Sequence, residues 1–420
     1  MNSRFLAAVL GLMVAMCSSS SAAETGPATP WKVGVPIVTY WCGPAMTDAV
    51  ARQMAEGGWN LVWCSEKELE VVSRHGLRAQ LTDPLLAPAS LDDPARKEKL
   101  DALIARVRTN SVLYAYFITD EPNATNFPAL GRLVAYLRER DPAHVAYINL
   151  FPTYASNEQL GNRGDTVTAY RAHLRQYVDT VKPALISYDH YQFAVNGDNA
   201  QYFLNLALIR RAAEDAGLPF LNIVQACTWT PSMRVPTGDE MRYLVYTTLA
   251  YGAQGISYYV YSCAGHKGAI ANADGTPTPL YHALKALNRE FVAVASQSQP
   301  LRCLGVYHAG MLPPGAEPLP QDAAFVVDPP VPAQKYQPPE PVKGVLLGCF
   351  GQPGETRTAK SATHVVVVNL DYKAEATLGI RGPAPLEIFD AATGEWSPAG
   401  GIRAELRLPH GGGRLMRVRH

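Results

Sequence analysis

The chain has 420 residues and equal numbers of acidic and basic side chains, 37 of each, so its formal net charge is zero. A hydrophobic fraction of 47% is enough for a sizeable core, and the length fits a barrel-sized domain plus a smaller module. This neutral balance gives no reason to expect nucleic acid or an anionic membrane as a partner.

The N-terminus has the pattern of a secretory signal peptide. Residues 1–4 carry a positive charge, residues 5–16 are apolar, and residues 18–23 are small. We therefore expect cleavage after residue 23 and a periplasmic or secreted mature protein. A lipid anchor at Cys17 is the alternative, although a bulky Met16 precedes it. The apolar run is too short to span a bilayer, and no later stretch is typical of a membrane span.

Strand-like and helix-like segments alternate through residues 31–298. The strands are expected at 33–41, 60–65, 77–83, 112–120, 144–152, 184–193, 219–226 and 255–263. Runs that are apolar on both faces, each followed by a helix, indicate a parallel sheet. Eight such units predict an α/β fold, a (β/α)8 TIM barrel. Capping boxes at Ser65/Glu68 and Thr237/Glu240 predict two of the helix starts, and Gly217 predicts a helix end.

The pattern changes over residues 299–420. Helical periodicity is lost, and residues 312–343 form a Pro-rich segment that predicts an irregular loop. Short strand-like runs then follow at 344–350, 363–371, 376–382, 386–390 and 414–420. They predict a C-terminal antiparallel β-sandwich domain, which either braces the barrel or binds glycan.

Six cysteines remain after the expected cleavage, and an oxidising compartment permits disulfides. No CxxC spacing is present, so we expect no metal site. Neighbouring barrel strand ends suggest two pairs, and the expected sandwich holds two further cysteines that suggest a third, with buried free thiols as the alternative. The suggested pairs are Cys42–Cys64, Cys227–Cys263 and Cys303–Cys349.

Active sites of such barrels form at the C-terminal ends of the strands. Carboxylates, amides and aromatic side chains gather at these ends. The candidate catalytic residues are Glu121, Asp120 and Asp189. The candidate substrate-binding residues are Trp41, Glu66, Asn149, Tyr188, His190, Tyr191, Gln225, Trp229, Tyr258 and Tyr261. Aromatic rings stack on sugars, amides and carboxylates bond hydroxyls, and paired carboxyls cleave glycosidic bonds, so a carbohydrate is the expected partner.

The fourth strand ends in Thr119-Asp120-Glu121-Pro122-Asn123. This resembles the Asn-Glu-Pro motif that ends strand four in clan A glycoside hydrolases, with Asp120 in place of Asn. The resemblance implies that Glu121 is the acid/base. The barrel followed by a β-sandwich is also similar to many such enzymes.

The seventh strand departs from that resemblance. The clan places its nucleophile, a Glu, at the end of strand seven, where this chain has Gln225. Two alternatives remain. Asp189 supplies the second carboxylate, or Asp120 and Glu121 act together. Adjacent Asp-Glu on strand four resembles hexosaminidases, in which Asp orients a 2-acetamido group and Tyr188 or Tyr191 would bond its oxygen.

Several candidates also have structural interpretations. Asp120-Glu121 suits a helix cap, Glu66 suits a helix start, and Asp189 suits an ion pair. His190 is also typical of a hydrogen-bonded residue in the barrel wall. Tyr258 and Tyr261 of strand eight are also typical of side chains that fill the barrel interior.

The sequence therefore predicts an exported glycosidase without a cofactor. The alternative is a non-catalytic carbohydrate-binding barrel, which the missing strand-seven acid favours. A lyase or aldolase would need a Schiff-base Lys or metal ligands at strand ends, and the sequence offers neither there.

Overall fold

A computed structural model describes residues 35–354 and 358–419. The predicted signal peptide, residues 1–23, and Cys17 lie outside the described residues. Within the described ranges, no helix is both long and apolar enough to cross a bilayer.

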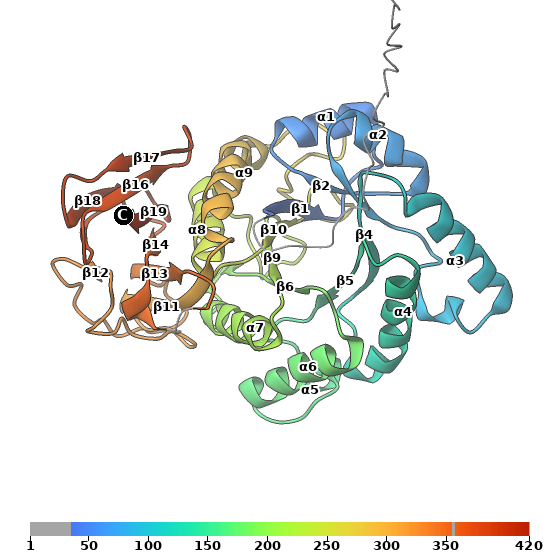
Figure 1. Cartoon of the computed structure of the whole chain (residues 1–420), viewed down its shortest axis with the longest axis horizontal. Coiled ribbons are helices and arrows are strands. Elements are labelled where there is room, and N and C mark those ends of the chain that lie inside the picture. Colours follow the sequence, from blue (N-terminus) through green and yellow to red (C-terminus); the bar gives the residue numbers. More distant parts are fainter. Residues whose placement is uncertain (1–34, 355–357, 420) are drawn as a thin grey trace, which may run out of the picture.

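The N-terminal part is the predicted (β/α)8 barrel (Figure 1). Eight parallel strands form one sheet in the order β1-β10-β9-β6-β5-β4-β3-β2. Their bounds are β1 Ile37–Trp41, β2 Leu61–Cys64, β3 Arg78–Leu81, β4 Leu113–Asp120, β5 Val145–Leu150, β6 Ile186–His190, β9 Phe220–Gln225 and β10 Gly255–Tyr259. The expected eight strand–helix units are confirmed.

Asn60 closes the seam between β1 and β2. Its backbone amide donates to the Val38 carbonyl at 3.0 Å, and its side-chain oxygen accepts from the Val38 amide at 3.0 Å. Its side-chain nitrogen donates to the Pro36 carbonyl at 3.1 Å. One amide side chain thus satisfies backbone groups that would otherwise lack strand partners.

Helices surround the sheet. Their bounds are α1 Asp48–Glu56, α2 Leu69–Arg74, α3 Pro94–Val107, α4 Phe127–Arg140, α5 Asn157–Leu160, α6 Thr166–Val181, α7 Tyr202–Ala216, α8 Gly238–Ala250 and α9 Pro279–Ser298. Both predicted capping boxes are present, the first at the short 3-10 turn Glu66–Glu68 before α2. Gly217 ends α7 at φ +66°, a left-handed conformation that suits glycine.

The C-terminal part is the predicted antiparallel β-sandwich. One sheet has the order β11-β13-β14-β19-β16-β17, and the other has the order β12-β15-β18. The bounds are β11 Arg302–Gly310, β12 Val326–Val327, β13 Gly344–Gly351, β14 His364–Asn369, β15 Ala376–Arg381, β16 Leu386–Asp390, β17 Glu395–Pro398, β18 Arg403–Leu408 and β19 Gly413–Val418. Strands β11, β12, β17 and β18 were not predicted.

The sandwich shares a hydrophobic core with the barrel. In β14, Val366 and Val368 pack with the barrel helices, whereas Val365 and Val367 pack against the three-stranded sheet. Both faces of the strand are buried, which explains why its valines do not alternate with polar residues. Figure 1 shows the orange-to-red strands beside α8.

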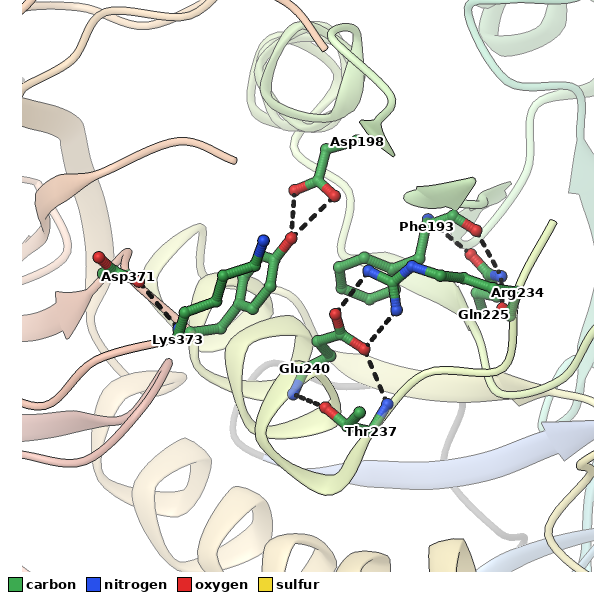
Figure 2. Close-up of polar contacts among 9 residues, drawn as sticks. Phe193, Asp198, Gln225, Arg234, Thr237, Glu240, Asp371 and Lys373 are labelled. Atoms are coloured by element: carbon green, nitrogen blue, oxygen red, sulfur yellow. Dashed lines mark hydrogen bonds and ion pairs between the residues drawn. The ribbon is translucent and has the colours of Figure 1, made fainter. Parts of the chain in front are cut away.

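Polar contacts join the same two parts (Figure 2). The hairpin of β7 Phe193–Ala194 and β8 Gly197–Asp198 follows β6. The Tyr372 hydroxyl of the sandwich bonds the Asp198 carboxylate at 2.9 and 3.0 Å. Burial raises the pKa of Asp198 to about 6. The sandwich thus holds a loop that emerges at the C-terminal rim of the barrel.

None of the three suggested cysteine pairs is bonded in the structure, where the six described cysteines are free thiols. Cys64 packs in the barrel–helix core, whereas Cys42 packs in a separate small cluster at the rim. Cys303 and Cys349 belong to opposite faces of the sandwich sheet. Sequence position at neighbouring strand ends did not reveal which way each side chain points.

Candidate active site

A β-bulge directs Asp120 into the barrel mouth. Strand β4 pairs with β5 as Phe117 with Tyr147, but then as Asp120 with Asn149. The register shift between Phe117 and Thr119 inserts one extra residue in β4. Side chains alternate along a regular strand, so Thr119 would share the inward face with Phe117. The extra residue shifts the alternation by one position, and Asp120 takes that face instead. The bulge therefore places a carboxylate where regular alternation would place Thr119.

Glu121 follows with a rare backbone conformation. Its φ is +42°, in the left-handed region that residues with a Cβ seldom adopt. Its backbone amide donates to the Asn149 carbonyl at 2.9 Å, which continues the pairing with β5. Strain of this kind is found most often where function requires a fixed side-chain direction.

Asn149 joins the carboxylates of two strands. Its side-chain nitrogen donates to Asp120 at 3.0 Å and to Asp189 at 2.8 Å. Its oxygen accepts a hydrogen bond from Ser187 Oγ at 3.0 Å, and Ser187 lies 2.7 Å from the Tyr147 hydroxyl. This network fixes two of the three acids at the mouth.

The three acids have different electrostatic surroundings. Burial, then the charge of Asp120, raises the pKa of Glu121 to about 7, and a hydrogen bond with Asp189 opposes that rise. Asp189 is fully buried, and burial followed by the charge of Glu121 raises its pKa well above the usual range. Asp120 reaches solvent, but the surrounding protein still raises its pKa. At neutral pH, Glu121 and Asp189 therefore retain protons more readily than ordinary carboxyls.

A cavity of about 160 Å³ opens above these acids. It is lined by Trp41, Asp120, Glu121, Asn149, Asp189, Tyr191, Ile223, Trp229 and Tyr259. None of these described lining residues is Lys, Arg or His. The Tyr191 ring lies 4.6 Å from Trp229 and 4.9 Å from Tyr259, centroid to centroid, so these three rings form one aromatic wall.

A wider hollow of about 600 Å³ meets the cavity at Asp120 and Glu121, which line both. Residues following β3, β4 and β5 form its other walls. They include Pro88, Asn126, Ala129, Phe151 and Gln159. Glu121 thus stands between a small aromatic cavity and a broad open surface.

The structure brings together seven of the predicted site residues and places the other six away from the cavity. The seven that line it are Trp41, Asp120, Glu121, Asn149, Asp189, Tyr191 and Trp229. The six outside its lining are Glu66, Tyr188, His190, Gln225, Tyr258 and Tyr261.

Each of those six has another environment. Glu66 makes a two-point ion pair with Arg106, at 2.6 and 2.9 Å. Tyr188 and His190 belong to the opposite face of β6 from Asp189, and His190 packs between the rings of Tyr154 and Tyr202. Tyr258 bonds Asn288 at 2.8 Å, and Tyr261 bonds Gln53 at 2.9 Å, so both face the helices. The expectation that these five bind substrate does not match their placement.

Gln225, the residue at the strand-seven position, braces a loop. Its side-chain oxygen accepts from the Phe193 amide at 2.8 Å, and its nitrogen donates to the carbonyls of Phe193 and Arg234 at 3.1 and 2.6 Å (Figure 2). The side chain is fully buried and its hydrogen-bonding groups are occupied. Gln225 therefore holds the loop that carries Phe193 and Arg234 and does not line the cavity.

Ile223 and Tyr259 line the cavity but were not predicted. Both belong to strands whose two faces are buried, so the sequence did not show which residues face the barrel interior. Trp41 of β1 lines the cavity and pairs with Tyr259 of β10. Residues paired across parallel strands share a face, so the strand register would have identified Tyr259.

No protein family model matches the chain, and no curated protein matches its sequence. Solved structures with similar chain traces include a β-L-arabinopyranosidase from Geobacillus stearothermophilus, at 9% identity and TM-score 0.49, covering 94% of this chain and 98% of that one. A β-galactosidase from Marinomonas ef1 matches at 10% identity and TM-score 0.44. The match covers 62% of this chain and 60% of the β-galactosidase chain. A mannanase catalytic domain from a Streptomyces species matches at 14% identity and TM-score 0.41, covering 69% and 97%. These neighbours are glycosidases, but similarity this low does not determine the reaction of this chain.

Proposed function

We propose that the chain is an exported glycoside hydrolase in which Glu121 is the general acid. The observation that carries the proposal is the position of Glu121, at the boundary of the two hollows and with a pKa of about 7. A general acid works best when its pKa lies near the working pH, because it must hold a proton and also release it. Export is inferred from the pattern of residues 1–23.

Asp120 is the second carboxylate of the proposed mechanism. A glycosidase needs one carboxyl that is protonated and one that is ionised, and their surroundings separate the two pKa values. Burial raises the pKa of Asp120, but Asn149 donates a hydrogen bond that stabilises its ionised form. Asp120 can therefore act as a base for water or orient a group of the substrate.

Asp189 has a supporting role in this mechanism. Burial, followed by the charge of Glu121, raises the pKa of Asp189 well above the usual range. Full burial also disfavours its ionised form. Asp189 thus accepts a hydrogen bond from Asn149 and holds that side chain in place.

The cavity favours one uncharged sugar unit. Its volume of about 160 Å³ is below the usual 300–1,000 Å³ of small-molecule pockets, which suits a single ring. Aromatic faces complement the C–H faces of a sugar, and the acids accept its hydroxyl protons. A lining with three carboxyls and no cation disfavours acidic sugars. The wide hollow on the other side of Glu121 would receive the leaving group.

The test is hydrolysis of a panel of aryl glycosides by wild type and Glu121→Gln. We expect turnover of a neutral glycoside by the wild type and, for aryl glycosides with weakly acidic leaving groups, a loss of about 100- to 10,000-fold in Glu121→Gln. N-acetylhexosaminides belong in the panel, since preference for them would indicate that the substrate's acetamido group participates. Full activity of Glu121→Gln would refute the assignment.

A non-catalytic carbohydrate-binding barrel is the second candidate. The observation that favours it is Gln225, which occupies the strand-seven position and is fully hydrogen bonded to the loop. An inactive wild type that still binds glycans on an array would support this candidate.

A further inference from the structure

Three cysteines gather at the rim where the barrel closes. Cys42 follows β1, Cys227 follows β9, and Cys263 lies four residues beyond β10. All three pack in one small cluster with Val260 and Ala269. No group of three or more His, Cys, Asp or Glu side chains among the described residues is arranged to hold a metal ion. A thiol cluster without metal-binding geometry suggests a different use.

The backbone already joins the segments that carry Cys42 and Cys263. The amides of Tyr261 and Ser262 both donate to the Cys42 carbonyl, at 3.1 and 3.4 Å. The Cys42 thiol lies 3.9 Å from the Ser262 carbonyl, and Cys42 packs in the same small cluster as Cys263. The two side chains are therefore held together by contacts that do not depend on a bond between them.

Cys227 differs from this pair in two respects. Its side chain is fully buried, whereas Cys42 and Cys263 are both partly exposed. The neighbouring segments that the backbone ties to Cys42 are those of Tyr261 and Ser262, next to Cys263 and not to Cys227. Thiol–disulfide exchange needs access to the attacking sulfur, so Cys42 and Cys263 are the accessible partners.

We propose that Cys42 and Cys263 form a disulfide in the mature protein, and that Cys227 remains a free thiol. In the reaction, one thiolate attacks the disulfide of a thiol oxidoreductase or of a small-molecule donor. The second cysteine thiolate then attacks the cysteine sulfur of the mixed disulfide and expels the donor's remaining thiolate. Two protons and two electrons leave the cysteines, one Sγ–Sγ bond forms, and the donor is reduced to two thiols.

The bond would link the loops after the first and last barrel strands, beside the cavity. Trp41 precedes Cys42, and Tyr259 and Trp229 pack against the same cluster. These three side chains also line the cavity. The disulfide would therefore fix the aromatic wall as well as close a loop of more than 200 residues, which restricts the unfolded chain strongly.

The test is peptide mapping of the purified full-length protein, incubated with oxidised glutathione, alkylated and digested without reductant. The proposal predicts one cross-linked species joining the peptides of Cys42 and Cys263, with Cys227 alkylated only after denaturation. Alkylation of Cys42 and Cys263 as free thiols, or a bridge from either to Cys227, would overturn it.

A matched series of variants supplies a second readout. Reductant should lower the melting temperature of oxidised wild type and of Cys227→Ser by about 5 °C. It should leave Cys42→Ser and Cys263→Ser unchanged, because neither can form the bond. An equal response in all four proteins would contradict the pairing, and peptide mapping remains decisive if one variant fails to fold.

Discussion

Glu121 combines a strained backbone, a partly buried carboxyl and a charged neighbour at one residue. Its φ of +42° and its raised pKa both cost folding free energy. Glycine would avoid the backbone strain, and glutamine would avoid the buried charge. The presence of Glu at this position is best explained by the reaction proposed for it.

The charge of Asp120 sets part of the Glu121 pKa. Removing that charge in Asp120→Asn should lower the pKa of Glu121 below about 7, but not to its ordinary value, because burial is the larger cause. A general acid must be protonated, so the alkaline limb of kcat/KM should move to lower pH in this variant. A pH–rate profile of any residual activity checks this, and an unchanged alkaline limb would show that another group titrates.

Stability should respond to the same carboxyl. The folded-state pKa of Glu121 is above its unfolded value of 4.5, so the folded protein binds the proton more tightly. Wild type therefore loses stability as pH rises from about 4.5 to about 7. Glu121→Gln lacks this loss and should be more stable than wild type at pH 8, by roughly 1–2 kcal/mol after allowing for solvent screening. Thermal melts at pH 5 and pH 8 test this, and an equal difference at both pH values would contradict it.

At the element scale, helix α4 forms one wall of the proposed leaving-group hollow. Ala129 lines that hollow, whereas Ala135 is exposed on the same helix outside it. Ala129→Trp should lower kcat/KM for an oligosaccharide roughly tenfold, a loss near 1.4 kcal/mol, with little change for an aryl glycoside.

Ala135→Trp is the matched control and should leave both substrates unaffected. If Ala129→Trp impaired the aryl glycoside as strongly as the oligosaccharide, the hollow would have no special role in binding the leaving group.

Elements were predictable where local chemistry determines them. The capping boxes of α2 and α8 and the glycine after α7 follow from backbone hydrogen bonding and left-handed geometry. Side-chain direction on doubly buried strands was not predictable. His190 and Tyr258 are on the helix-facing side of their strands, while Asp189 and Tyr259 line the cavity. The bulge that turns Asp120 inward also leaves no mark in the sequence, because it depends on pairing with β5.

At the scale of the whole molecule, the barrel and sandwich fold as close neighbours. Gly348 of β13 packs on α8, where an added Cβ would lie 2.1 Å from the Ala250 carbonyl oxygen. Gly348→Ala must therefore separate strand and helix, at a cost of about 1–3 kcal/mol. We expect a melting temperature several degrees lower.

Gly401→Ala is the control, because no atom lies within 4 Å of the corresponding Cβ. Equal melting temperatures for the two variants would show that the close contact between α8 and β13 is not maintained in solution.

The central claim is that Glu121 donates the proton to the leaving group, and leaving-group dependence tests it most directly. The measurement is kcat/KM of wild type and Glu121→Gln for aryl glycosides of one sugar with leaving groups of increasing acidity. A good leaving group departs without a proton, so the loss in Glu121→Gln should shrink from about 100-fold or more to a few-fold along the series. A constant loss across the series would contradict the account, since it would show that Glu121 supports the site without acting as its acid.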